Sequence, residues 1–275
     1  MRHFMLLPLT LTAACTATLA PLPAGRSIDT PAFETYVTGH NGFSRVRLDH
    51  SGAGDAAVIA QFEDADPIDP TGYRSLIALD EALYGGRVSI EVLAEVDTGT
   101  GATRRLLRLT TDQSPFLNES GGQLTTASGQ FHLRGANFAW VSIDGGPLLS
   151  GSDAQGLVTM VLDFDTETVS LNLRTGVSDD SQVRVEITAT DLPLNIRTGA
   201  YGDDIVIQVW DPESPDILLI DGSLRGNVGG TPVYGEGEHD LSTSGLYIGD
   251  GEDAATGRHV RIEGLFVGRD PNVQP

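Results

Sequence analysis

Hydrophobic and polar residues alternate along much of the second half of the chain, which is the pattern of strands that bury one face. The clearest hairpin joins Leu157–Phe164 to Thr168–Arg174, whose apolar positions face the same side across a short polar turn. The pattern predicts eight strands in this half of the chain: Gly129–Ile143, Leu157–Phe164, Thr168–Arg174, Gln182–Ile196, Asp204–Trp210, Ile217–Gly226, Gly245–Ile248 and His259–Val267.

Eight antiparallel strands at this spacing fit an up-and-down barrel, whose closure leaves no exposed strand edge. A sandwich of two sheets gives nearly the same pattern in a sequence, so it stays open at this point. We predict a mainly β protein, with an eight-stranded antiparallel β-barrel over residues 129–270 and a short tail over residues 271–275.

Residues 31–112 are predicted to form a β-rich region with one short helix. The helix is expected over Arg74–Tyr84, where leucines recur on one helical face. Residues 113–128 are mostly polar and are expected to be a linker or a long loop. The strands expected in this region are Phe33–Val37, Phe43–Leu48, Ala57–Phe62, Val88–Val96 and Arg104–Leu109.

The composition supports short strands and narrows the range of partners. The chain has 33 glycines and 14 prolines, which favours turns over long helices. It carries 38 acidic residues against 17 basic ones, all of them arginine, for a net charge of -21. Such a charge repels nucleic acids and anionic membrane surfaces, so we expect no nucleic-acid partner. Without lysine, Schiff-base catalysis and a P-loop lysine are excluded.

The first residues have the pattern of a bacterial export signal, with a positive start and then an apolar run, Phe4–Leu11, that is too short to span a bilayer. The next residues, Thr12-Ala13-Ala14-Cys15, resemble the lipobox of bacterial lipoproteins, with Thr12 where leucine is usual. The resemblance implies that residues 1–14 are a signal peptide and that Cys15, the only cysteine, is lipidated. The alternative is an ordinary signal peptide that is cut near Ala20.

A lipidated Cys15 would anchor the protein to a membrane, with residues 15–30 as a tether. We therefore expect an exported protein at the outer membrane or cell surface, with a periplasm-facing position also open. Lipidation would also leave no thiol for a disulfide or for a catalytic nucleophile.

Motifs that carry chemistry are weak in this chain. The segment Val96-Asp97-Thr98-Gly99 matches the core of an aspartic-protease motif, but a hairpin turn explains it better. The loop Gly249–Asp253 is the best calcium candidate, although a solvated turn is the simpler interpretation. Trp140 and Trp210 could touch a ligand at a barrel rim, but core packing is favoured.

The histidines show no metal-binding spacing: His40, His50, His132, His239 and His259 are scattered along the chain. The sequence also contains no Gly-x-Ser-x-Gly motif, so a serine hydrolase of that type is not indicated. We assign no catalytic residue, no metal ligand and no cofactor, and the ligand-binding residues stay unknown.

The second half of the chain resembles a known family of surface proteins. One shared feature is a strand that ends in Asp163-Phe164, followed by a short turn and a strand rich in Thr, Leu and Ser. Another is a pair of closing strands with glycine and aromatic residues, Gly245–Gly249 and Gly264–Gly268. These features resemble the C-lobe β-barrel of transferrin-binding-protein-like lipoproteins. The family pattern usually has a glycine soon after the Asp-Phe pair, where this chain has Asp165.

The resemblance implies a binding protein of the cell envelope with an unknown protein or small-molecule ligand. Transferrin is a poor fit, because the lysine-rich surfaces of the transferrin receptors are missing. Two alternatives stay open. A secreted hydrolase would need a clustered acidic pair in a cleft, and a passive envelope lipoprotein would have a filled barrel and no apolar surface patch.

Overall fold

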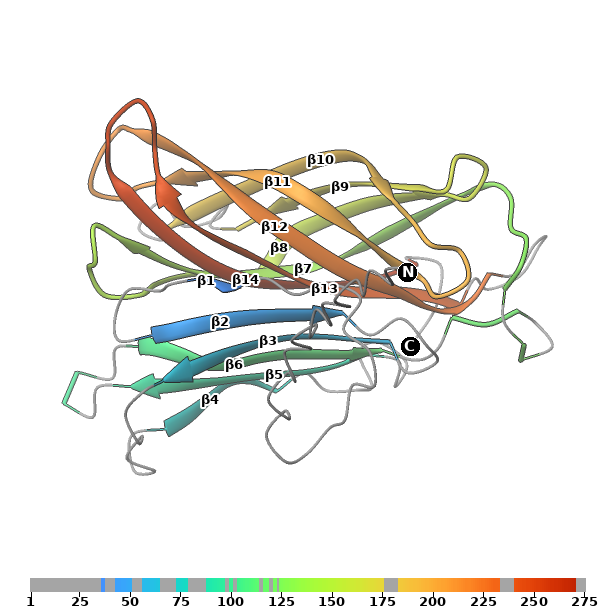
Figure 1. The fold of residues 1–275 in the computed structure, drawn as a ribbon, viewed down its shortest axis with the longest axis horizontal. Helices are drawn as coiled ribbons and strands as arrows, with labels where there is room; N and C mark the ends of the chain where they lie inside the picture. Colours follow the sequence, from blue (N-terminus) through green and yellow to red (C-terminus); the bar gives the residue numbers. More distant parts are fainter. Residues whose placement is uncertain are drawn as a thin grey trace, which may run out of the picture.

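The structure is a computed structural model, which describes residues 36–37, 43–50, 56–64, 73–78, 88–96, 99–100, 103–113, 116–118, 121–122, 124–175, 183–232 and 240–270. The described part of the chain is all β, with antiparallel strands and no helix. The strands form one closed barrel and one separate six-stranded sheet (Figure 1). Within the described residues, no helix is long and apolar enough to cross a membrane.

The second half of the chain forms the predicted eight-stranded antiparallel barrel, so this prediction is confirmed. Its strands are β7 (Gln130–Ile143), β8 (Leu149–Asp163), β9 (Thr168–Arg174), β10 (Arg184–Pro193), β11 (Ala200–Trp210), β12 (Ile217–Thr231), β13 (Asp240–Glu252) and β14 (His259–Arg269). Each strand pairs with its neighbour in sequence, and β14 returns to pair with β7. This closure removes the alternative of a two-sheet sandwich.

The hairpin of β8 and β9 has the alternation that the sequence predicted. Met160 lies opposite Leu171, Leu162 lies opposite Val169, and all four side chains are buried. Asp163 then starts the turn, because its carboxylate accepts hydrogen bonds from the backbone N–H groups of Asp165 and Thr166. A hydrogen bond from the Gln130 side chain, together with these backbone bonds, holds the pKa of Asp163 below its usual value.

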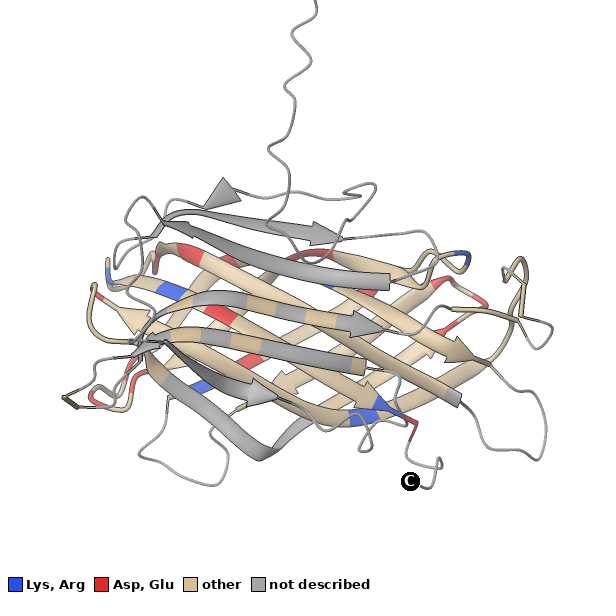
Figure 2. Ribbon diagram, turned by 90° about the horizontal axis from the view of Figure 1, so that it is seen from below, with Lys and Arg blue, Asp and Glu red and all other residues tan. Residues whose placement is uncertain are grey.

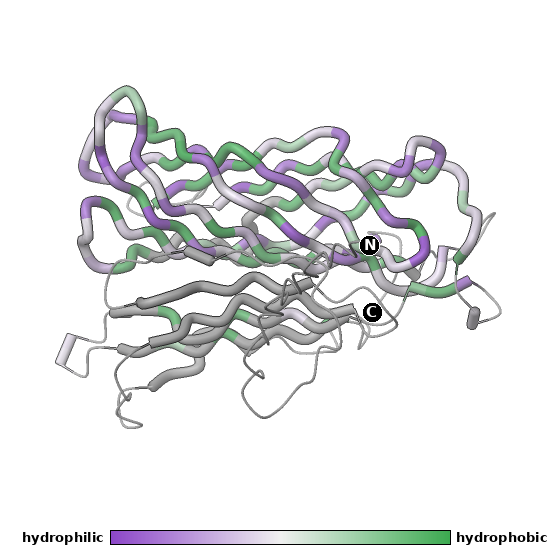
Figure 3. The backbone as a smooth tube through the Cα atoms, viewed as in Figure 1, coloured by the Kyte–Doolittle hydropathy of each residue, from purple (hydrophilic) through white to green (hydrophobic). Residues whose placement is uncertain are grey.

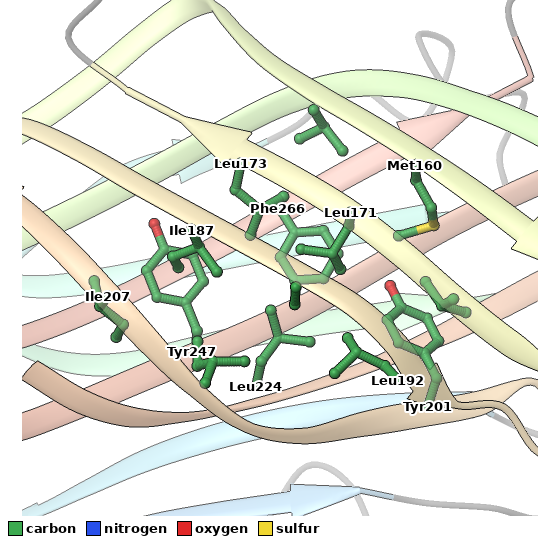
Figure 4. Packing of buried hydrophobic residues seen from close by; sticks show 14 of the residues in the cluster. Met160, Leu171, Leu173, Ile187, Leu192, Tyr201, Ile207, Leu224, Tyr247 and Phe266 are labelled. Atoms are coloured by element: carbon green, nitrogen blue, oxygen red, sulfur yellow. The ribbon is translucent and has the colours of Figure 1, made fainter.

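The interior of the barrel is filled by side chains, as the small diameter of an eight-stranded barrel requires. Aliphatic residues surround the rings of Tyr201, Tyr247 and Phe266 (Figure 4). The phenol groups keep hydrogen-bond partners: Tyr201 shares a bond of 2.7 Å with Thr243, and Tyr247 donates to Asn137 at 3.0 Å. Burial raises the pKa of both phenols well above their usual value.

Each of these rings lies against a glycine on the neighbouring strand. Tyr247 pairs with Gly264, Phe266 with Gly245, and Tyr201 with Gly226. A Cβ added at Gly264 would lie 2.0 Å from the ring carbon Cζ of Tyr247. The Gly-x-aromatic-x-Gly segments of β13 and β14 therefore have a packing role, in which each glycine makes room for the opposite aromatic ring.

The N-terminal half contributes a sheet with the strand order β1-β2-β3-β6-β5-β4. Its strands are β1 (Tyr36–Val37), β2 (Phe43–His50), β3 (Ala56–Asp64), β4 (Tyr73–Ala78), β5 (Val88–Val96) and β6 (Thr103–Gln113). In Figure 1 this sheet lies beneath the barrel, and the two form a second apolar cluster between them. The members of this cluster include Val92, Leu106 and Leu109 from the sheet and Trp140, Leu246 and Leu265 from the outer face of the barrel.

The prediction of a helix over Arg74–Tyr84 is wrong for the first part of this segment, because Tyr73–Ala78 forms strand β4. Here Tyr73 pairs with Glu95 and Ile77 pairs with Val92. Leucine spacing at three and four residues favours a helix only weakly, and pairing with β5 overrides it. The remaining residues of the expected helix lie outside the described residues.

The segment between β6 and β7 brings further apolar side chains to the barrel. Phe116 forms a bridge with Gly230 and stacks on Phe164 at 5.9 Å between ring centroids. Phe116 and Leu124 are both buried members of the barrel core. The described residues of this segment therefore pack on the end of the barrel.

Candidate functional site

A pocket of about 750 Å³ opens at the end of the barrel where β10 turns into β11. It is lined by residues from several separate segments: Thr125, Glu167, Pro193, Leu194, Asn195, Ile196, Arg197, Ala200, Tyr201, Gly202 and Arg225. We call it the barrel-end pocket. Because the barrel interior is filled, this pocket lies at the mouth of the barrel and does not continue into a lumen.

The turn between β10 and β11 forms one wall of this pocket and is held rigidly. The Asn195 side chain accepts a hydrogen bond from the Arg197 N–H at 3.0 Å, and its carbonyl accepts one from Gly199 at 2.8 Å. Gly199 has a φ of 78°, which favours glycine, and its carbonyl accepts a bond from the Val228 N–H. The pocket wall is thus preorganised by bonds to its own turn and to β12.

The pocket combines an apolar wall with charged groups. Leu194 and Tyr201 are buried, and Ile196 packs on the barrel core. Arg225 is partly buried, and this burial lowers the pKa of its guanidinium, while the nearby carboxylates of Asp203 and Asp204 act in the opposite direction. Arg197 and Glu167 contribute two more charges to the lining. Such a site suits a ligand that has an apolar body and a polar or charged group.

The opposite end of the barrel is a network of ion pairs that joins its turns. Arg258 contacts Asp144 at 2.9 Å and Asp211 at 2.7 Å, which ties the β13–β14 turn to the two neighbouring turns. These bonds raise the pKa of Arg258 and lower the pKa of Asp144. Acidic residues are found at both ends of the barrel and along its strands (Figure 2).

The calcium candidate Gly249–Asp253 lies beside this network, and two of its carboxylates, those of Asp250 and Asp253, already have protein partners. Asp253 accepts hydrogen bonds from the Leu219 N–H and from both the N–H and the hydroxyl of Thr256, which lower its pKa. Asp250 contacts His259 at 2.9 Å. Among the described residues, no group of three or more His, Cys, Asp or Glu is placed to hold a metal ion.

A buried group of charges lies on the outer face of β13 and β14, on the side that packs against the N-terminal sheet. Arg261 forms an ion pair with Glu263, and Asp250 lies opposite Arg261 on β13. Burial raises the pKa of Glu263 to about 7. Arg261 and Glu263 are almost completely buried, so a substrate has no access to this perturbed carboxylate.

The outer wall of the barrel also exposes apolar side chains. Val206, Ile217 and Leu219 are each about half exposed and lie on the neighbouring strands β11 and β12. Trp210 lies at the end of the same face, directly opposite Ile217. We call these four residues the β11–β12 strip.

The other residues that the sequence suggested do not assemble into a site. His132 is exposed on β7, and Trp140 is buried in the cluster between barrel and sheet, as core packing predicts. Gly99 lies in the turn that joins β5 to β6, which fits the hairpin interpretation of the Asp-Thr-Gly motif. Cys15, Asp97, His40 and His239 lie outside the described residues.

Sequence reasoning missed the barrel-end pocket, because its lining comes from separate segments with no common spacing. It also missed the β11–β12 strip, for which a signal existed. Ile217-Leu218-Leu219-Ile220 is a run of four apolar residues, and a strand with such a run is apolar on both faces.

No protein-family profile and no curated protein matches this sequence. Solved structures with similar folds include a double mutant of transferrin binding protein B from Haemophilus parasuis, with 11% identity and a TM-score of 0.44. They also include transferrin binding protein B from Neisseria meningitidis serogroup B, with 12% identity and a TM-score of 0.42. The first alignment covers 86% of this chain and the second covers 84%. Each of them covers 42% of the solved chain.

A third neighbour is HpuA from Kingella denitrificans, solved in complex with human haemoglobin. Its identity is 9% and its TM-score is 0.36, with 84% of this chain and 86% of that chain covered. These neighbours include transferrin binding proteins, the proteins whose C-lobe barrel the sequence resembles. This chain spans less than half the length of the transferrin-binding proteins, and the likeness assigns no residue, ligand or partner to it.

Proposed function

We propose that this protein is a binding protein of the cell envelope, lipid-anchored at Cys15, which holds a ligand in the barrel-end pocket. The observation that carries the proposal is a preorganised pocket of about 750 Å³ at the mouth of a barrel whose interior is filled. Ligand pockets in proteins are typically about 300–1,000 Å³, and the volume of this pocket lies in that range.

The lining suggests the chemistry of the ligand. Leu194, Ile196 and Tyr201 suit an apolar body, and the guanidinium groups of Arg197 and Arg225 suit an acidic group at one end. An amphipathic anion is therefore the ligand class that the pocket accommodates best. The Arg225 guanidinium also donates to the Leu224 carbonyl, and the nearby carboxylates of Asp203 and Asp204 offset part of its charge.

Two other functions fit less well. A hydrolase with an acidic pair needs two carboxylates in one cleft, and Glu167 is the one carboxylate among the residues that line this pocket. A passive envelope component should have no apolar surface patch, whereas the described part of the chain exposes the β11–β12 strip.

Titration with anilinonaphthalene sulfonate, an apolar anion whose fluorescence rises in apolar sites, tests the pocket. We expect saturable binding to the wild-type protein and about tenfold weaker binding to the variant Arg225→Met, since a hydrogen bond to a charged group is worth roughly 1.5–3 kcal/mol. Arg174→Met, outside the pocket on β9, is the matched control and should bind as the wild type does. Equal binding by Arg225→Met and the wild type would count against the proposal.

Lipidation is tested separately by growing cells that express the full chain with an alkyne-tagged fatty acid. We expect the label on the wild-type protein and its complete loss in Cys15→Ser, because acylation needs the thiol. Cys15→Ser should also move from the membrane fraction to the soluble fraction. A label that persists in Cys15→Ser, or an unlabelled wild type, would contradict the anchor.

A further inference from the structure

The β11–β12 strip is a continuous apolar surface on the outer wall of the barrel. Along β11, Ile205, Ile207 and Val209 point into the buried core, so Val206 and Trp210 point outward. Ile217 lies directly opposite Trp210, and Leu219 lies opposite Gln208, diagonal to Val206. Diagonal neighbours on a sheet are about 7–8 Å apart, close enough for large side chains to touch.

Elsewhere on the outer wall of the barrel, an apolar surface is covered by the N-terminal sheet. Leu246, Leu265 and Trp140 also point outward from the barrel, yet the N-terminal sheet buries all three. On β9 and β10 the outward residues are polar, as Ser170, Asn172 and Thr188 illustrate. Figure 1 shows β10 and β11 on the side of the barrel away from the N-terminal sheet.

One end of the strip is organised by a stacked arginine. The Arg184 guanidinium lies 4.3 Å from the centre of the Trp210 ring, and Arg184 also pairs with Glu186 at 3.3 Å. Arg174 contacts the other oxygen of Glu186, also at 3.3 Å. These contacts fix the position of a tryptophan at the border of an apolar surface, which is the kind of residue that anchors protein interfaces.

Acidic side chains surround the rest of the strip. Asp221 lies opposite Val206, and Asp204 precedes Val206 by two residues on β11, on the same face of the strand. Glu213 and Asp216 lie in the turn that connects the two strands, and all four of these acidic residues are exposed. The alternation of green and purple segments on these strands is visible in Figure 3.

We propose that the β11–β12 strip is a docking surface for a basic protein, one that presents apolar side chains flanked by lysine or arginine. Apolar contact supplies the affinity, and the acidic border selects and steers the basic partner. A second copy of this chain would bring another net charge of -21 to the same acidic border, which opposes self-association through the strip. None of the four strip residues lines the barrel-end pocket, so this proposal does not depend on the ligand proposed there.

Two synthetic peptides serve as probes in isothermal titration calorimetry, one of alternating leucine and lysine and one of alternating leucine and glutamate. We expect the lysine peptide to bind the wild-type protein saturably, more weakly at high salt, and the glutamate peptide not to bind. The double variant Ile217→Ser/Leu219→Ser should bind the lysine peptide at least about tenfold more weakly. Both residues are about half exposed, so this variant should melt at the wild-type temperature.

Matched control variants test whether weaker binding of the lysine peptide is specific to changes in the strip. Asn172→Ser, on the polar outer face of β9, and Arg225→Met, in the barrel-end pocket, should both bind the lysine peptide as the wild type does. Wild-type affinity in the double variant, or equal binding of the glutamate peptide, would overturn the proposal. If only Arg225→Met lost binding of the lysine peptide, the peptide site would be the barrel-end pocket and the proposal would be wrong. If the wild-type protein formed a dimer that the double variant cannot form, the occupant of the strip would be a second copy of this chain.

Discussion

Replacing Gly264 by alanine is expected to destabilise the protein by about 3 kcal/mol, at the upper end of the usual cost of overpacking a core. The added Cβ would lie 2.0 Å from Cζ of Tyr247 and 2.3 Å from its hydroxyl oxygen. The ring has little freedom to move away, because its hydroxyl donates to Asn137 and it is enclosed in the filled barrel. Urea unfolding followed by circular dichroism measures the change in free energy.

The matched control is Gly251→Ala, near the end of the neighbouring strand β13, where Gly251 pairs with Val260 of β14. A Cβ at Gly251 meets nothing within 4 Å, so this variant should stay within about 0.5 kcal/mol of the wild type. Adding Tyr247→Leu to Gly264→Ala should cost clearly less than the sum of the two single changes, because it removes the clashing ring. Equal stability of the two glycine variants, or strict additivity of the double variant, would refute the pairing of Gly264 with Tyr247.

The eight barrel strands could be predicted because buried core residues and outward residues alternate along these strands, which is a local pattern in the sequence. In Thr168–Arg174 buried and outward residues alternate at every position, and the predicted bounds of this strand match the structure. Strand β8 begins at Leu149, earlier than the sequence pattern predicts. The pattern misses this start because residues Ser150–Gly156 are polar or small and show no alternation of apolar and polar positions. Pairing with β7 in the closed barrel extends the strand there.

The candidate sites could be predicted less well, and the reason is physical. The pocket exists only after the β8–β9 turn, the β10–β11 turn and Arg225 of β12 come together, so no local pattern marks it. The glycine and aromatic residues of β13 and β14 stood out in the sequence as a family feature. Their packing role follows from the strand register, which places Tyr247 opposite Gly264 and Phe266 opposite Gly245.

The buried charges between barrel and sheet lead to a second large effect, which depends on pH. One cation, Arg261, lies close to two carboxylates, those of Glu263 and Asp250. A single carboxylate balances the charge of Arg261, and burial penalises the second. This accounts for the pKa of Glu263, which burial raises to about 7 from its ordinary value of 4.5.

The sign of the pH dependence follows from this shift. Below pH 4.5 Glu263 is protonated in both the folded and the unfolded chain, so its contribution to stability is fully present. As the pH rises from 4.5 to about 7, the unfolded chain releases this proton while the folded protein keeps it, so the free energy of unfolding falls. The total loss from this one group is about 3 kcal/mol, and above the folded pKa no further loss is expected.

Glu263→Gln tests this directly, because the amide is permanently neutral and its oxygen can still accept a hydrogen bond from Arg261. The variant should have nearly wild-type stability at pH 5 and should exceed the wild type by up to about 3 kcal/mol at pH 8. Comparing the two proteins at each pH cancels the effects of the other acidic residues, which both chains share. A Glu263→Gln protein that is several kcal/mol less stable than the wild type at pH 8 would mean that the pKa of Glu263 in the folded protein lies below its ordinary value of 4.5. Its pairing with Arg261 would then outweigh the cost of burying both charges.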